Sequence, residues 1–146
     1  KCCIGKGGST NKKKEGDKKT PKGEFEIENL YFRKDRIKKP TTKLKCIEIK
    51  KDMGWCDDIS FPKKYNKIFK IKKKIKHEKL KRNDHKYDLL IPIKYNFKKP
   101  VTGLGSCIFI HLTRDYKATA GCVALKKKDF LIMLKLIKKN SKIKIS

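Results

Sequence analysis

The sequence predicts a mainly β domain with one or two helices. Several short segments alternate apolar and polar side chains, or are rich in β-branched and aromatic residues, as strands are. Glycine, proline and asparagine separate these segments, which is typical of turns. One longer segment, residues 127–140, has the spacing of an amphipathic helix. We expect residues 1–146 to form a single domain, because this length suffices for one core.

The first half of the chain has the weaker signals. Three segments are expected to form strands, because they are β-branched and aromatic or follow a turn: a segment beginning near Phe25, residues 29–32 and residues 43–50. Residues 53–67 are expected to be irregular, since Gly54, Pro62 and adjacent aspartates disfavour regular structure. Residues 68–82 fit either a basic helix or a strand with a long loop.

The second half has clearer strands. Residues 87–96 alternate, which predicts one shared face for Tyr87, Leu89, Ile91, Ile93 and Tyr95. Pro92 removes one donor from that strand and favours an edge or a bulge there. Residues 106–112 have two apolar faces, as expected of a strand buried between layers. One face carries Cys107, Phe109 and His111, and the other carries Ile108, Ile110 and Leu112.

The end of the chain predicts the helix and a closing strand. An apolar stripe runs along residues 127–140, formed by Phe130, Met133, Leu134 and Ile137. Asp129 near the start and lysines near the end suit the helix dipole. Residues 141–146 are expected to form a final short strand.

The formal net charge of +27 raises the question of nucleic-acid binding. Basic residues are spread over nearly the whole chain, and almost all are lysine. Only Arg33, Arg36, Arg82 and Arg114 carry the planar fork that suits recognition of bases and phosphates. We therefore expect a basic surface that attracts anionic surfaces at long range, without dedicated nucleic-acid binding.

Cysteine spacing and hydropathy bear on whether the protein is a metal-binding or a membrane-spanning one. The six cysteines include no C-x-x-C pair, so we expect no metal site, and their spacing does not reveal any disulfide pairing. No segment approaches the roughly 20 apolar residues of a membrane span. The chain begins at Lys1 rather than Met, so an upstream signal peptide or anchor is compatible with it.

His111 and Cys122 allow two interpretations. A histidine that ends a strand and a cysteine after glycine are commonly structural. The alternative is catalytic, because a thiol with an ordinary pKa near 8.5 needs a neighbouring base to act as a nucleophile at neutral pH. His111 supplies that base if residues 113–121 fold back, and Gly121 permits a bend that directs the Gly121 and Cys122 amides toward an oxyanion. Composition leaves both interpretations open.

Several motifs together resemble the catalytic domain of L,D-transpeptidases, the YkuD-type domain. "GSCIFIHL" followed by "TAGCVAL" is similar to the family's catalytic segment, where a strand histidine precedes a Ser/Thr-x-Gly-Cys turn. "GDKKTPKG" resembles the family's Gly-Asp-x-x-Thr-Pro-x-Gly motif. "MGWCDD", "KYNK" and "RNDHKYDLLIPIKYN" resemble a proteobacterial branch. The resemblance covers nearly the whole chain, in the same order.

The resemblance implies a β-sandwich-like enzyme of the periplasm or cell envelope that acts on peptidoglycan stem peptides. It implies that Cys122 attacks the carbonyl of the third residue of a donor stem, with His111 as the general base. Thr119 matches the Ser/Thr position and would order the turn. An amine of a second stem would then resolve the thioester into a 3-3 crosslink, a step of cell-wall biosynthesis that affects cell shape. The resemblance implies no metal or organic cofactor, and it implies that carbapenems acylate the cysteine.

Two departures leave the acceptor open. Ala120 and Ala124 stand where the commonest family pattern has His and either Asn or Arg. Water as the acceptor would make the enzyme an L,D-carboxypeptidase, and a protein acceptor would attach or release wall proteins. The rival from another class is a non-catalytic basic module that binds anionic wall polymers or nucleic acid.

Four further residues match the branch pattern and are candidates for substrate binding. Arg82 or Arg114 would hold a stem carboxylate, and Trp55 or Tyr87 would line the cleft. The alternative is structural in each case, with Tyr87 in the core and Trp55 filling space.

Overall fold

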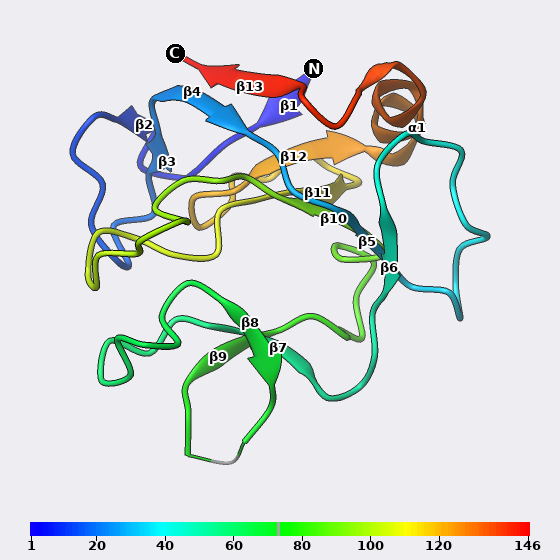
Figure 1. Cartoon of the computed structure of the whole chain (residues 1–146). Helices are drawn as coiled ribbons and strands as arrows, with labels where there is room; N and C mark the ends of the chain where they lie inside the picture. The colour runs from blue at the N-terminus through cyan, green and yellow to red at the C-terminus, as the bar shows by residue number, and fades with distance from the viewer. Residues whose placement is uncertain (73) are drawn as a thin grey trace.

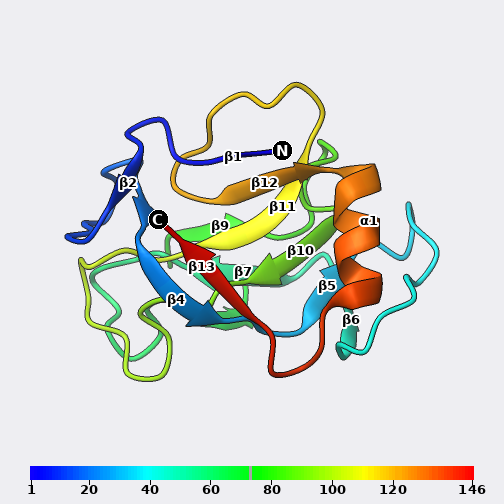
Figure 2. The ribbon, with the colours of Figure 1, turned by 90° about the horizontal axis from the view of Figure 1, so that it is seen from above.

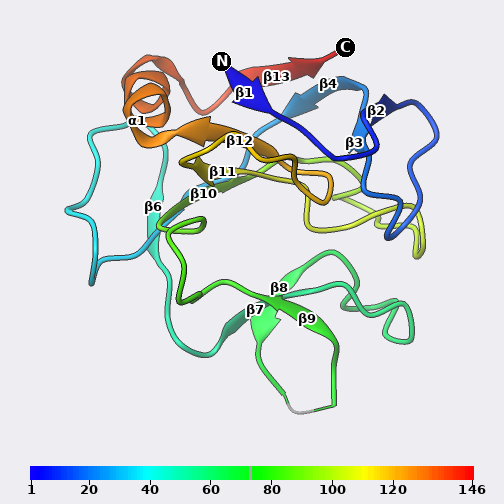
Figure 3. The ribbon, with the colours of Figure 1, turned by 180° about the vertical axis from the view of Figure 1, so that it is seen from behind.

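A six-stranded mixed sheet forms the centre of the computed structural model, which describes residues 1–72 and 74–146 (Figure 1). Across this sheet the strands lie in the order β1 (Cys2–Cys3), β12 (Val123–Lys126), β11 (Phe109–Thr113), β10 (Leu89–Pro92), β5 (Leu30–Phe32) and β6 (Cys46–Glu48). β11 pairs antiparallel with β10 and parallel with β12. Figure 3 shows β1 beside β12 at one edge.

Smaller sheets flank the central one. Among the described residues they are β13 (Lys142–Ile145) with β4 (Gly23–Glu26), β2 (Ser9–Thr10) with β3 (Thr20–Pro21), and β8 (Ile68–Lys70), β7 (Met53–Cys56) and β9 (His77–Lys79) together. The one helix of the described residues is α1 (Lys127–Leu136). Figures 1 and 2 show α1, β4 and β13 over one face of the central sheet, with the β7–β9 sheet below the other.

β11 lies between two hydrophobic cores, and all of its residues are buried. Its Ile110 and Leu112 pack in the core that also contains Phe130 and Leu134 of α1. Phe109 points to the opposite side, into a core with Trp55. The prediction of a buried strand with two apolar faces is therefore confirmed, as is the prediction of a mainly β domain.

Most of the other element predictions are confirmed as well. Strands occur in every segment for which they were predicted, and α1 buries Phe130 and Leu134 of the predicted stripe. Residues 68–82 contain β8 and β9 rather than a helix, and Lys73 of this segment lies outside the described residues. Within the described part of the chain, no helix is long and apolar enough to cross a membrane.

Three details of the strand predictions need correction. Residues 53–67 were expected to be irregular, but Met53–Cys56 forms the central strand of the β7–β9 sheet. Gly54 fits there because a side chain would press on the His77 ring, 3.0 Å from the position of a Cβ. Tyr87 does not share a face with Leu89, because β10 begins only at Leu89 and Tyr87 packs in the opposite core. Pro92 lies in a central strand, although as its last residue.

Candidate active site

One cavity of about 550 Å³ collects most of the residues predicted to form the site. Its lining includes the end of β11, the turn before β12 and the segment between β9 and β10. Six of the predicted residues line it: His111, Cys122, Thr119, Arg114, Tyr87 and Arg82. Trp55 and Gly121 do not line it.

The parallel pairing of β11 and β12 brings the histidine and the cysteine together. Ile110 pairs with Val123 and His111 with Ala124, so Cys122 enters β12 beside Phe109. The Phe109 amide donates a hydrogen bond to the Cys122 sulfur, 3.4 Å away. Because side chains alternate along a strand, Phe109 and His111 point to the same face, toward the cavity side of the sheet.

His111 is a buried, neutral imidazole. Its Nδ1 lies 2.9 Å from the carbonyl oxygen of Leu112. A carbonyl only accepts, so we assign the proton to Nδ1, which leaves Nε2 with a free electron pair. Burial lowers the pKa of His111 to about 4, with a smaller opposing effect of the Leu112 carbonyl. At neutral pH the ring is therefore uncharged, and the electron pair of Nε2 is available as an acceptor.

Cys122 is a protonated thiol in this structure. Burial raises its pKa to about 12, partly offset by the Phe109 amide. The thiol donates a hydrogen bond to the Cys107 carbonyl oxygen, 3.2 Å away. The hydrogen bonds of the described residues include none between this sulfur and the His111 ring, so the thiol must turn from Cys107 before His111 can take its proton.

The turn before Cys122 depends on glycine and threonine. Gly121 has a φ of +139°, and a Cβ there would lie 2.9 Å from the Lys19 carbonyl oxygen. The Thr119 hydroxyl accepts a hydrogen bond from the Gly121 amide at 3.1 Å and donates one to the Cys122 carbonyl at 2.6 Å. The Gly121 amide, expected to face an oxyanion, is thus bonded to Thr119.

The N-terminal segment supports this turn from behind. The Lys6 amide donates to the Thr119 carbonyl at 2.8 Å, and the Thr119 amide donates to the Ile4 carbonyl at 2.9 Å. Gly5, between these two residues, donates its amide hydrogen to the buried Thr20 hydroxyl at 2.8 Å. Thr20 of the Thr-Pro motif therefore stabilises residues 4–6, and these residues in turn stabilise the turn before Cys122.

The walls of the cavity carry charge and an aromatic ring. Tyr87 packs edge-on against His111, with ring centroids 5.5 Å apart. The Arg82 guanidinium lies 5.0 Å above the Tyr87 ring and forms ion pairs with Glu78 at 2.8 Å and Asp84 at 2.7 Å. These carboxylates already compensate the Arg82 charge. Arg114, by contrast, is exposed and forms no ion pair with the described residues.

Trp55 lies in the core behind the cavity. It is 2% exposed, and its ring packs edge-on against Phe109 with centroids 5.2 Å apart. Its indole N–H donates to the Asn66 side-chain oxygen at 2.9 Å. Its position supports the structural alternative for this residue.

Sequence reasoning missed several groups of the site. The carbonyls of Leu112 and Cys107 gave no signal, because every residue type offers a carbonyl. His85 is half-buried and lines the cavity, and its Nε2 is buried without a hydrogen-bond partner in the described structure. Glu78, which binds Arg82, could have been suspected only from its spacing of four residues from that arginine.

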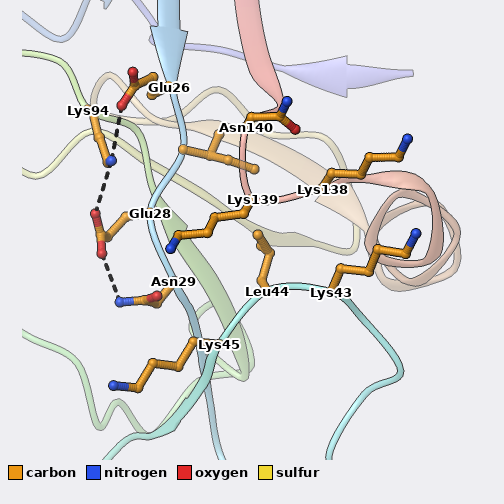
Figure 4. Close-up of a pocket in the computed structure, with 11 residues that line it drawn as sticks. Glu26, Glu28, Asn29, Lys43, Leu44, Lys45, Lys94, Lys138, Lys139 and Asn140 are labelled. Carbon is orange, nitrogen blue, oxygen red and sulfur yellow. Dashed lines mark hydrogen bonds and ion pairs between the residues drawn. The ribbon is translucent and has the colours of Figure 1, made fainter.

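A larger cavity of about 900 Å³ lies elsewhere, between residues 26–29, 43–45 and 138–140 (Figure 4). It contains no cysteine or histidine, so it offers no thiol chemistry. Lys94 on its wall lies between Glu26 at 3.1 Å and Glu28 at 3.6 Å. Four further lysines line it, and none of them forms an ion pair with the described residues: Lys43, Lys45, Lys138 and Lys139.

Residues 1–72 and 74–146 contain no group of three or more His, Cys, Asp or Glu side chains that could hold a metal ion. All six cysteines are free thiols. The 550 Å³ cavity brings together a thiol, a neutral imidazole and the charged groups around them.

Comparison with known protein families supplies the wider context. Residues 1–145 match the L,D-transpeptidase catalytic domain family, YkuD. Comparisons with curated proteins and with solved structures give no match. Members of the matched family are transpeptidase-type enzymes that act on the peptidoglycan of the cell wall. The match spans all of the elements that build the cavity, and the chain therefore belongs to the L,D-transpeptidase catalytic domain family.

Proposed function

We propose that this chain is a cysteine-dependent L,D-transpeptidase that forms 3-3 crosslinks between peptidoglycan stem peptides through a thioester on Cys122. The observation that carries the proposal is the pairing, in one cavity, of a thiol with a neutral imidazole whose Nε2 is free to accept a proton. Family membership supports the same reaction class.

The proposed first half-reaction transfers the acyl group to the sulfur. His111 Nε2 takes the Cys122 proton, and the sulfur attacks the carbonyl carbon of the third residue of a donor stem. The Cys122 amide, which has no hydrogen-bond partner among the described residues, is the candidate donor to the oxyanion. Collapse of the tetrahedral intermediate breaks the peptide bond, and the leaving amine of the terminal D-alanine takes the proton from His111.

The second half-reaction regenerates the thiol. The side-chain amine of a neighbouring stem loses a proton to His111 and attacks the thioester carbonyl. The new amide bond forms as the carbon–sulfur bond breaks, and the sulfur recovers its proton from His111. No oxidant, reductant or nucleotide is needed, because the thioester preserves the energy of the broken peptide bond.

Substrate recognition falls to the charged wall of the cavity. Arg114 is the better candidate for a stem carboxylate, because Arg82 already binds two carboxylates. Tyr87, which contacts His111, would then border the reacting carbonyl rather than bind charge.

The direct test is the Cys122→Ala variant, expressed in place of the wild type in cells of the source organism. We expect the 3-3 crosslinked muropeptides of digested sacculi to fall to background by mass spectrometry, with folding unchanged. Crosslinks that persist at the wild-type level would refute the proposal.

Three rival functions are separated with purified protein. Incubation with tetrapeptide stems alone should yield crosslinked dimers, whereas an L,D-carboxypeptidase would yield tripeptides only, and an enzyme that attaches or releases wall proteins would require a protein partner. A non-catalytic basic module would give neither product, and its binding to wall polymers would be unchanged by Cys122→Ala.

A further inference from the structure

Asn66 is a buried amide outside the cavity whose hydrogen-bonding groups are all used. It is 3% exposed and lies between β7 and β8. Its side-chain oxygen accepts from Trp55 Nε1 at 2.9 Å and from the Cys107 amide at 3.1 Å. Its side-chain nitrogen donates to the carbonyls of Tyr95 at 3.1 Å and Asn96 at 2.7 Å. Asn66 thus connects the β7–β9 sheet to the segment that leads into β11.

The hydrogen bond between Asn66 and the Cys107 amide stabilises a residue with a strained backbone. Cys107 has a φ of +54°, in the left-handed region that residues other than glycine adopt only when their surroundings impose it. Its amide is held by Asn66, and its carbonyl accepts the Cys122 thiol at 3.2 Å. The direction of a carbonyl follows from the backbone conformation of its residue, so the contact that fixes Cys107 also fixes where the Cys122 thiol points.

We propose that Asn66 is a positioning residue for Cys122, which it orients through the amide and carbonyl of Cys107. The inference rests on the proposed role of Cys122 as the nucleophile. In the resting enzyme burial keeps the sulfur protonated, and the hydrogen bond that the thiol donates to the Cys107 carbonyl stabilises the same neutral form. The charges of Glu78, Lys13 and Arg82 act on the thiol with smaller effects. The proton leaves only when the thiol turns toward His111.

This arrangement has a chemical consequence. The thiolate, rather than the thiol, is the form that peroxides oxidise and alkylating agents attack. A thiol stored against a carbonyl is therefore protected until substrate enters the cavity. If Asn66 only connected the loops, Asn66→Gly would lower the free energy of unfolding and leave the pKa of the Cys122 thiol in the folded state unchanged.

The variant that tests the inference is Asn66→Gly. Asn66 itself has a φ of +53°, so glycine removes the amide without adding the backbone strain that alanine would add. The measurement is the rate of Cys122 alkylation by iodoacetamide against pH, read from the Cys122 peptide by mass spectrometry. We expect the midpoint of this pH profile to move to lower pH by about one unit, which makes alkylation at pH 8 about tenfold faster.

Asn96→Gly is the matched control. Asn96 also has a positive φ, of +49°, and its side chain forms hydrogen bonds with Val101 and Gly105 but none with Cys107 or Cys122 among the described residues, so this variant should retain the wild-type profile. If Asn66→Gly does not fold, the double variant Asn66→Gly/Cys107→Gly is compared with Cys107→Gly instead, because it no longer carries a strained residue at position 107. The same shift is expected there.

The inference would be overturned if the midpoint of the alkylation profile were unchanged or moved to higher pH in folded Asn66→Gly relative to the wild type, or in the double variant relative to Cys107→Gly. The readout does not depend on transpeptidation. Crosslinking that survives Cys122→Ala would instead remove the proposed function, whatever the alkylation profile of the Asn66 variant.

Discussion

At the scale of single residues, the site depends on what surrounds a histidine and a cysteine. Burial lowers the pKa of His111 to about 4, and the Leu112 carbonyl determines which ring nitrogen is free. The resemblance to the L,D-transpeptidase family predicted that His111 and Cys122 act together, and both line one cavity, whereas strand position and the glycine turn alone left a structural role open for each. The sequence could not predict the Leu112 and Cys107 carbonyls, since a main-chain acceptor leaves no trace in residue type.

The buried imidazole should make stability depend on pH. Its pKa is about 4 in the folded chain and about 6.5 when unfolded, so the unfolded state binds the proton first as pH falls. This contribution to stability is complete above pH 6.5 and is lost toward pH 4. Between pH 7 and pH 4 the wild type should therefore lose up to about 3 kcal/mol more unfolding free energy than His111→Gln. Urea unfolding at several pH values measures this difference, and parallel curves for the two proteins would contradict the assignment.

At the scale of elements, the turn of Cys122 is held by a segment about a hundred residues away in sequence. The chain from Ile4 to Lys6 hydrogen-bonds to Thr119, and Thr20 at the start of β3 holds that chain through the Gly5 amide. A motif near the N-terminus thus acts on the site without contacting the sulfur.

Thr20→Val should loosen this support. Valine keeps the volume but leaves the buried Gly5 amide without an acceptor, which should cost about 1–3 kcal/mol of unfolding free energy. We also expect faster hydrogen exchange at the Lys6 and Thr119 amides. Thr42→Val is the control, because the Thr42 hydroxyl accepts the Leu44 amide at 3.2 Å far from this turn. Equal exchange at Thr119 in both variants would show that Thr20 has no special part in holding the turn.

The elements also show where local patterns mislead. Alternation in residues 87–96 continues back to Tyr87, yet β10 begins at Leu89, and Tyr87 lies in the cavity wall instead. Met53–Cys56 was missed because glycine in a strand is normally unfavourable, whereas Gly54 sits where the His77 ring approaches the backbone. In both places tertiary contacts, which no local pattern contains, decide the outcome.

At the scale of the whole molecule, the net charge of +27 is spread along the sequence, but some parts of the surface should attract anionic polymers more strongly than others. The lysine-lined cavity of Figure 4 combines four lysines that form no ion pair with the described residues and a fifth, Lys94, which offsets one of the two glutamate charges on its wall. Such a concave basic surface concentrates anionic polymers more strongly than scattered charges do.

Neutralising that cavity should weaken binding to purified sacculi. The variant replaces four lysines with glutamine: Lys43, Lys45, Lys138 and Lys139. The control makes the same change in net charge at four exposed lysines elsewhere: Lys12, Lys22, Lys51 and Lys128. We expect the cavity variant to lose about tenfold or more in affinity at low salt, since each lysine near an anionic surface contributes roughly 1 kcal/mol, and the control to lose less. Equal losses would mean that only the total charge matters.

The central claim is that Cys122 becomes acylated with His111 as its base. The most direct measurement is the intact mass of the purified protein after incubation with a carbapenem, followed by peptide mapping. The account predicts one covalent adduct per chain, on Cys122, which is lost in Cys122→Ala and forms far more slowly in His111→Gln. A wild-type protein that stays unmodified, or an adduct that persists in folded Cys122→Ala, would contradict it.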